Sequence, residues 1–171
     1  MREIRLLGDP VLRETCAPVE AVTPEVRALA DDLRDTMIAA EGVGLAAPQI
    51  GVPLRVFVYD VADPEPASGV LINPRITSAT GTVKESEGCL SIPGLSELVE
   101  RSARITIEGL DRDGTEVRIE AEGLLARCLQ HENDHLDGVL FIDRLSPLKR
   151  RMLVKKWSKM DEADRRPISA L

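Results

Sequence analysis

The sequence predicts an α+β fold, in which mixed or antiparallel β-sheets pack around a central helix, with one more helix near each end. Three observations lead to this prediction. Segments of helical periodicity and segments of strand-like alternation both occur. An Asp-Gly pair at residues 113–114 separates two strand patterns, which is typical of a hairpin. The 171 residues, 43% of them hydrophobic, suit a single domain with a sizeable core.

The N-terminal part of the chain predicts a helix followed by a loop and strands. Thr23 and Pro24 form a start signal, with threonine as N-cap and proline at the first helical position. The apolar stripe of this helix consists of Val26, Leu29, Ala30, Leu33 and Met37, and Gly42 marks its expected end. Residues 42–51, GVGLAAPQIG, are expected to form a loop. Strands are expected over residues 54–59 and over residues 70–73, where Pro74 stops the second.

The C-terminal part predicts a hairpin and two helices. Residues 104–110 and 115–121 are the expected strands of the hairpin. Residues 123–136 form the central helix, which ends near Gly138. Ser146 and Pro147 begin a helix that runs from residue 148 to about residue 160. Residues 161–171 contain little apolar content, so a flexible tail is expected.

Composition and charge exclude several classes of function. The net charge of -7 lacks the positive field of a nucleic-acid binder, so DNA is not an expected partner. No apolar run approaches the roughly 20 residues that span a bilayer, and residues 1–10 lack a signal-peptide core, so a cytoplasmic location is expected. Three cysteines are an odd number and do not indicate a disulfide framework.

The chemistry is concentrated in residues 130–138, QHENDHLDG, on the predicted central helix. His131 and His135 are the only histidines, and their spacing of four places both on one helix face, where they can bind one metal ion. Glu132 is rotated about 100° from His131, which suits a base acting on a metal-bound water. This HExxH pattern is the signature of zinc-type metallohydrolases.

A catalytic metal of this kind usually takes three protein ligands, and two cysteines are candidates for the third. Cys128 lies seven residues before His135, about 10 Å along one helix, which is too far for a shared ion. Cys128 is therefore expected to be an apolar wall of the pocket. Cys89 is the better candidate, because Gly88 beside it allows close approach of a ligand, although a buried structural thiol is equally compatible with these residues alone.

Three motifs together resemble the peptide deformylase family. They read GVGLAAPQ at residues 42–49, EGCLS at residues 87–91 and HENDH at residues 131–135, and they stand in the family's order. The similarity extends over roughly residues 2–160. The resemblance implies a metal-dependent hydrolase that removes the formyl group from the N-terminal formyl-methionine of nascent polypeptides and releases formate.

The family resemblance also implies roles for individual residues. Cys89, His131 and His135 are the implied ligands of one divalent metal ion, which is Fe(II) in most relatives and can be zinc, nickel or cobalt. Glu132 is the implied acid-base catalyst. The Gln49 side chain and the Leu90 backbone N–H are the implied donors to the developing oxyanion, although Gln49 without the family would be a surface amide.

The substrate is expected to bind as an added strand, with its methionine side chain in an apolar pocket. The residues expected to bind it are Val43, Gly44, Gly88, Leu124 and Cys128. Two positions depart from the family pattern. Arg127 replaces a commonly apolar residue, and its stem is expected to line the pocket while its charged head reaches water. Ser96 replaces an arginine of some relatives.

Other functions are also compatible with parts of the sequence. The basic helix near the C-terminus holds six lysines and arginines, and it is either a solvated face or, as the resemblance suggests, a docking surface for the ribosome. A general HExxH endopeptidase would not need Cys89. A metal-binding or redox-sensing module would not need Glu132. Release of formate from a formyl-methionyl peptide distinguishes these three functions.

Overall fold

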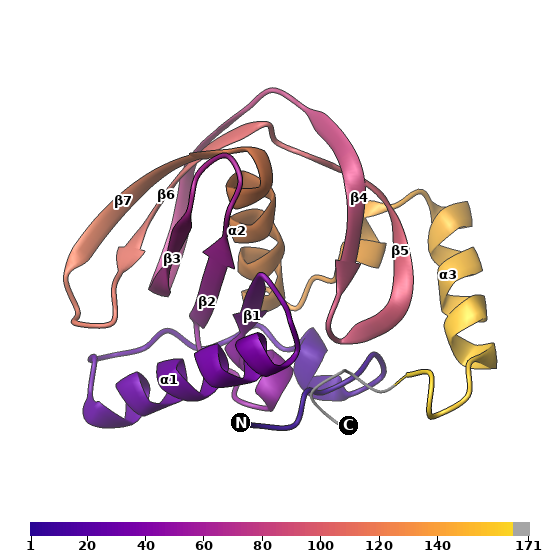
Figure 1. Cartoon of the computed structure of the whole chain (residues 1–171), viewed down its shortest axis with the longest axis horizontal. Helices are drawn as coiled ribbons and strands as arrows, with labels where there is room; N and C mark the ends of the chain where they lie inside the picture. Colours follow the sequence, from indigo (N-terminus) through magenta and orange to yellow (C-terminus); the bar gives the residue numbers. More distant parts are fainter. Residues whose placement is uncertain (166–171) are drawn as a thin grey trace.

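The fold consists of two antiparallel sheets and three α-helices over residues 1–165, which are the residues that the computed structural model describes (Figure 1). The five-stranded sheet has the order β1 (Gly44–Ala46), β2 (Val56–Val61), β3 (Ala67–Thr80), β6 (Arg104–Leu110) and β7 (Glu116–Glu122). The second sheet is the hairpin of β4 (Val83–Cys89) and β5 (Ile92–Arg101). The helices are α1 (Pro24–Ala39), α2 (Gly123–Leu136) and α3 (Pro147–Lys159). The predicted α+β class is confirmed, and every paired strand among these residues is antiparallel.

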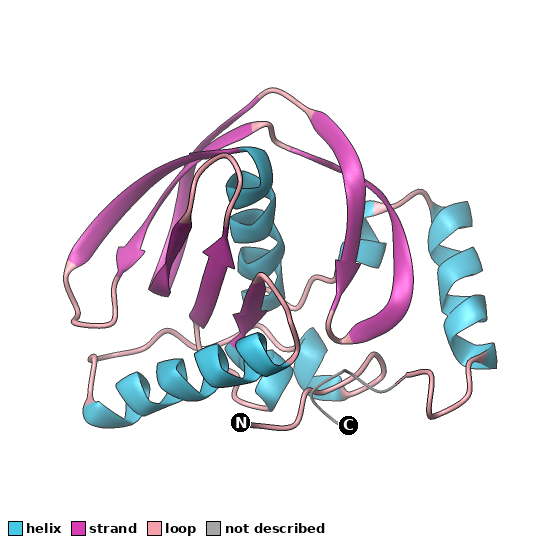
Figure 2. Ribbon diagram, viewed as in Figure 1, coloured by secondary structure: helices cyan, strands magenta, loops and turns pink. Residues whose placement is uncertain are grey.

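Helix α2 lies between the five-stranded sheet and the β4–β5 hairpin, and its bounds are the predicted ones (Figure 2). Its apolar side packs Leu125 and Leu129 against Phe57, Leu71 and Ile107 of the sheet. Full burial of a leucine or phenylalanine side chain stabilises the fold by about 1.5–3 kcal/mol. The opposite side of α2 is polar but is also buried, because it faces the hairpin. The sheet thus fixes the helix that carries both histidines.

Helix α1 begins as predicted. Thr23 is its N-cap, and the Thr23 hydroxyl accepts a hydrogen bond from the Val26 amide at 3.3 Å. The predicted apolar stripe is buried and packs against β1 and β2. Helical structure ends at Ala39, and the Gly42 amide closes the end by donating to the Met37 carbonyl at 3.0 Å.

The loop predicted over residues 42–51 is wrong. Residues 44–46 form β1, which pairs with β2, and a 3₁₀ turn follows over Ala47–Ile50. Residues 44–50 are all buried. Small side chains permit close packing on every side, so the segment shows neither the alternation of a half-buried strand nor the period of a helix.

Strand β3 is also longer than predicted, because it continues past Pro74. The pairing with β6 shifts register between Ile72 and Arg75, and Asn73 has a φ of 52° at this irregularity. The Asn73 side chain holds the bulge by two hydrogen bonds of 2.8 Å with the backbone of Val19. A proline has no N–H to donate, and a bulge is a position where a strand tolerates it. The neighbouring strand β2 begins at Val56, two residues later than predicted.

The β6–β7 hairpin is confirmed, whereas the β4–β5 hairpin was not predicted. Gly114 takes a φ of 83° in the β6–β7 turn, and its amide donates to the Asp111 carbonyl at 3.0 Å. Strand β4 is largely exposed and rich in charge, so its sequence lacks apolar alternation. Apolar side chains of β5, namely Ile92, Leu95 and Val99, pack in a core cluster with Phe141 and Trp157, and polar contacts with α2 also hold this second hairpin in place.

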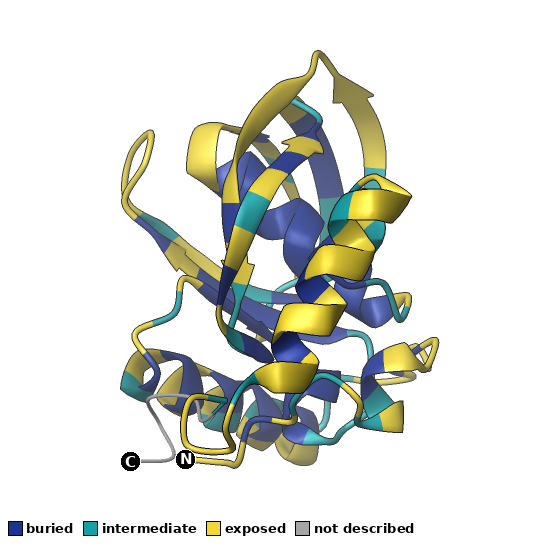
Figure 3. Cartoon of the chain, turned by 90° about the vertical axis from the view of Figure 1, so that its right-hand side faces the viewer, coloured by how far each residue is buried: buried dark blue, intermediate teal, exposed yellow. Residues whose placement is uncertain are grey.

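Helix α3 lies on the outside of the β4–β5 hairpin, and most of its surface is exposed (Figure 3). It begins at the predicted N-cap, Ser146, whose hydroxyl accepts from the Lys149 amide at 3.2 Å. Leu153 and Trp157 are its buried side chains. In the segment expected to be a flexible tail, residues 161–165 form hydrogen-bonded turns, and the guanidinium of Arg165 lies over the ring of Trp157. The remaining residues, 166–171, lie outside the described part. No helix among the described residues is long and apolar enough to cross a bilayer.

Candidate metal centre and active site

Three side chains that the sequence assigned to a metal come together. The Nε2 atoms of His131 and His135 lie 3.2 Å apart, and the Sγ atom of Cys89 lies 3.5 Å from Nε2 of His135. Candidate ligand atoms of all three residues lie within 4.8 Å of one another. Helix α2 supplies the histidines on one face, and the end of β4 supplies the cysteine.

These distances match those required for one tetrahedral ion. With metal–nitrogen distances of about 2.0–2.1 Å and a metal–sulfur distance of about 2.3 Å, tetrahedral angles separate two nitrogens by about 3.3 Å. The same geometry separates sulfur from nitrogen by about 3.6 Å. The donor set of one thiolate and two imidazoles suits iron, zinc, nickel or cobalt. The residues therefore fit a divalent metal of this group.

Cys128 does not join this cluster. Its Sγ atom donates to the Val43 carbonyl at 3.4 Å, and the side chain is buried in the wall of the cavity, as predicted. Burial, the largest cause, together with the nearby carboxylates of Glu132 and Glu87, raises the pKa of Cys128 well above its ordinary value. Cys128 is thus a neutral thiol that shapes the cavity.

Glu87 orients the first histidine. The Nδ1 atom of His131 lies 2.7 Å from the Glu87 carboxylate and donates a hydrogen bond to it. The Nε2 atom therefore presents a lone pair to the cluster. Two arginines, Arg101 and Arg127, also donate to Glu87. Burial alone would raise the pKa of Glu87, but hydrogen bonds and charge from His131 and Arg101 outweigh it and hold the pKa well below its usual value. Glu87 therefore stays anionic.

Glu87 is part of the EGCLS motif, but its role was not predicted from the sequence, and neither was that of Arg101. An acidic residue two positions before the candidate ligand Cys89 was the available signal for Glu87. No sequence pattern indicates Arg101, because its partners come from β4 and α2.

Glu132 lies beside the cluster and not within it. Its Oε1 atom is 3.9 Å from Nε2 of His131, and its Oε2 atom is buried with no hydrogen-bond partner among the described residues. Burial raises the pKa of Glu132 to about 7. A carboxyl group with a pKa in this range can both take and give a proton near neutral pH.

Gln49 is buried, so the surface-amide interpretation is wrong. Its Oε1 atom accepts from the Ala46 amide at 2.9 Å, which fixes the orientation of the side-chain amide. Its Nε2 atom donates to the Ser91 hydroxyl at 3.1 Å and to Sγ of Cys89 at 3.6 Å. Leu90 stands between Cys89 and Ser91 in the turn of the hairpin and also lines the cavity. The side-chain amide of Gln49 thus places a hydrogen-bond donor beside the cluster of Cys89, His131 and His135.

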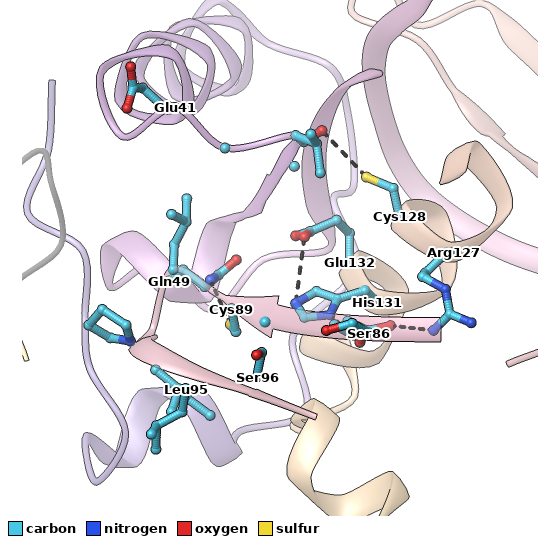
Figure 4. A pocket seen from close by; sticks show the side chains of 18 of the residues that line it. Glu41, Gln49, Ser86, Cys89, Leu95, Ser96, Arg127, Cys128, His131 and Glu132 are labelled. Carbon is cyan, nitrogen blue, oxygen red and sulfur yellow. Dashed lines mark hydrogen bonds and ion pairs between the residues drawn. The ribbon is translucent and has the colours of Figure 1, made fainter. Parts of the chain in front are cut away.

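A cavity of about 690 Å³ opens onto the cluster (Figure 4). All five residues expected to bind substrate line it: Val43, Gly44, Gly88, Leu124 and Cys128. At Gly44 a Cβ atom would lie 2.9 Å from both Cys128 and Glu132, so only glycine lets β1 approach α2 this closely. Ser96 lies opposite Gly88 across the hairpin and lines the same cavity.

The expectation that Arg127 extends its charged head into water is wrong. The residue is 8% exposed, and its guanidinium donates to Glu87 and to two backbone carbonyls of the hairpin. No sequence pattern indicates these acceptors, because they lie on β4 and β5. Arg127 is therefore part of the interior between helix and hairpin.

Comparisons with known proteins agree on one family. Residues 1–151 match the family model described as polypeptide deformylase. A peptide deformylase of Mesorhizobium japonicum is 53% identical over 94% of this chain and 93% of the relative, and one of Thermodesulfovibrio yellowstonii is 46% identical over 91% and 95%.

Solved structures give the same result. A peptide deformylase from Legionella pneumophila superposes with a TM-score of 0.87 at 48% identity, covering 93% of this chain and 94% of that one. One from Ehrlichia chaffeensis in complex with actinonin superposes with a TM-score of 0.90 at 39% identity, covering 95% and 98%.

Proposed function

Because the chain belongs to the polypeptide deformylase family, we propose that Cys89, His131 and His135 bind the catalytic metal ion. The enzyme is a metal-dependent hydrolase that removes the formyl group from the N-terminal methionine of nascent polypeptides. The observation that carries the proposed site is the ligand-like spacing of the three side chains. Fe(II) is the proposed native ion, with zinc, nickel or cobalt as substitutes. We place the reaction in the cytoplasm, where nascent chains are made.

A metal ion held by Cys89, His131 and His135 would supply Lewis acidity, which would make a water molecule a competent nucleophile near neutral pH. Glu132 is proposed to take a proton from the attacking water and to deliver one to the departing amine. Its buried Oε2 atom, without a hydrogen-bond partner among residues 1–165, is free to serve in this way. The raised pKa of Glu132 supports both halves of the role.

Gln49 and Leu90 are proposed to stabilise the oxyanion. The carbonyl oxygen of the formyl group gains negative charge as the tetrahedral intermediate forms, and donors already aimed at that position stabilise it. The Gln49 amide is fixed through Ala46 with its Nε2 atom on the cluster side, so it needs little reorganisation. The Leu90 backbone N–H, directly after the ligand Cys89, is the proposed second donor.

The peptide is proposed to bind along the cavity through its main chain. Val43 and Gly44 form one rim and Gly88 the other, so an extended peptide can add to the adjacent strand edges. Leu124 and Cys128 are proposed to surround the methionine side chain. They stand four apart on α2 and therefore face the same side. Recognition through backbone groups accounts for acceptance of many sequences after methionine.

Formate release from formyl-Met-Ala-Ser by the Fe(II)-loaded protein, prepared without air, tests the proposed site. Cys89→Ala should lose the metal and the activity together, whereas Glu132→Ala should retain the metal and lose nearly all hydrolysis. Full activity of the metal-loaded Glu132→Ala protein would contradict its acid-base role. An inactive wild-type protein that binds the metal would favour a binding module instead.

A docking surface for the ribosome is proposed on helix α3. The exposed cations Arg151, Lys155, Lys156 and Lys159 lie on this helix, whose surface is mostly exposed (Figure 3). A basic helix surface can bind the phosphate backbone of RNA, and such binding weakens steeply with salt. Pelleting with ribosomes at low salt, for the full chain and for a variant lacking residues 148–171, measures the contribution. Equal pelleting of the two would refute it.

A further inference from the structure

Arg127 is the one cation of α2 whose guanidinium contacts both strands of the β4–β5 hairpin within the described chain. Its Nη1 atom donates to the Val99 carbonyl of β5, and its Nη2 atom donates to the Val83 carbonyl of β4, each at 3.0 Å. The Nη1 atom also lies 3.0 Å from Oε1 of Glu87. The planar fork of an arginine fits such divergent acceptors, which the single ammonium of a lysine cannot reach together.

Glu87 connects Arg127 to the metal site. One carboxylate oxygen of Glu87 accepts from Arg127 and Arg101, and the other accepts from Arg101 and from Nδ1 of His131. Arg101 lies on β5, in the same hairpin as Glu87, so this pair does not by itself fix the hairpin relative to α2. Arg127 does, because it reaches Glu87 from the helix.

A second arginine links the hairpin and the helix in the opposite direction, because it lies on the hairpin and donates to α2. Arg101 of the hairpin donates to Asp134 of α2 at 2.7 Å, which lies next to His135 in sequence. Arg127 and Asp134 are seven residues apart on α2, so the two contacts between helix and hairpin lie about 10 Å apart along the helix. They fix the hairpin against residues 127 and 134 of α2, which lie on either side of His131, the second directly before His135.

We propose that Arg127 is a positioning residue that keeps Glu87 on His131 and keeps the Cys89-bearing hairpin at ligand distance from α2. The inference rests on the proposed function, because it assumes that Cys89, His131 and His135 hold the metal. Arg127 does not touch the reacting atoms. Its loss weakens the alignment of the thiolate, on one element, with the imidazoles, on another.

The rate of metal release to a chelator tests the proposal in the holoenzyme, with Co(II) as the probe. Arg127→Met preserves the length of the stem that lines the cavity and removes the fork. Metal release should accelerate about 10- to 100-fold, the usual effect of losing a group that supports metal ligands. The thiolate-to-cobalt absorption band should weaken or shift, because it reports the geometry at Cys89. The rate of cobalt release from Arg127→Lys should lie between those of the wild type and Arg127→Met.

Arg144→Met is the matched control. Arg144 donates twice to Asp134 in the same charge network but does not contact Glu87. The rate of cobalt release from Arg144→Met should stay within about twofold of the wild-type rate. An equal acceleration in Arg144→Met and Arg127→Met would overturn the proposal.

Three other outcomes decide the matter. A folded Arg127→Met protein that releases cobalt at the wild-type rate with an unchanged band would overturn the positioning role. Where Arg127→Met does not fold, Arg127→Lys decides alone, and wild-type release from it would also overturn the role. Failure of the wild-type protein to retain cobalt would instead overturn the proposed metal site itself, and the inference with it.

Discussion

Replacing Gly44 by alanine should impair catalysis without removing the metal. Gly44 lies in strand β1, and its φ is not among the positive values, so alanine is compatible with its backbone. The added Cβ atom would lie 2.9 Å from Sγ of Cys128 and from Cγ and Oε1 of Glu132. Both Cys128 and Glu132 would therefore have to give way, and the displacement of Glu132 is the one that bears on proton transfer.

The size of the movement follows from these contacts. An ordinary contact begins at 3.4 Å, so Glu132 must retreat by about 0.5 Å from its distance of 2.9 Å. A misplacement of about 1 Å at a reacting centre can lower a rate about 10²-fold. Half of that displacement corresponds to about a tenfold loss, or about 1.4 kcal/mol of activation free energy.

The assay is kcat for formate release from formyl-Met-Ala-Ser at saturating substrate, with the metal content measured on the same samples. Gly69→Ala is a suitable control, because its Cβ atom would approach Tyr59 at 3.0 Å in the sheet and does not line the cavity. A metal-replete Gly44→Ala enzyme with kcat within twofold of wild type would show that Glu132 needs no such precision.

Two further predictions concern the oxyanion donor and the stability at low pH. Gln49→Leu should lower kcat by about 10²–10³, the usual effect of losing one oxyanion donor, and turnover near wild type would remove Gln49 from that role. Burial tends to raise the pKa of Asp143, but hydrogen bonds from Arg13 and the Leu140 amide leave the pKa below its ordinary value. Because the folded pKa is the lower one, this stabilisation is present above the unfolded-state pKa and is lost as the pH falls through the folded pKa. The melting temperatures of wild type and Arg13→Met should therefore converge in acid, and a gap that stays constant from neutral to acidic pH would contradict this account.

Part of the candidate metal site could be predicted from the sequence because its chemistry is local. His131 and His135 stand on one helix, so their spacing alone brings them together. Cys89 lies 46 positions before His135, and geometry from sequence cannot bring it there. The family resemblance placed it among the candidate ligands, and the structure puts its sulfur 3.5 Å from a ring nitrogen of His135.

The elements that the sequence missed depend on tertiary contacts. Strand β4 is mostly polar and exposed, so no apolar alternation marks it. It is held from the inside by the ion pairs of Glu87 with Arg101 and Arg127, whose partners are far away in the chain. The charged head of Arg127 was expected in water because its acceptors also come from distant parts of the chain. A buried arginine cannot be distinguished from an exposed one until the acceptors around it are known.

The arrangement of the thiols has a practical consequence for labelling the protein. Burial raises the pKa of Cys16 to about 11 and that of Cys128 well above its ordinary value, and both side chains are buried. Alkylating reagents react with the thiolate, so these two cysteines are protected in the native state. Cys89 is partly exposed at the cavity. A maleimide or iodoacetamide probe should therefore attach at Cys89 alone. Because Cys89 is a proposed metal ligand, this labelling belongs to the metal-free protein and blocks the metal site.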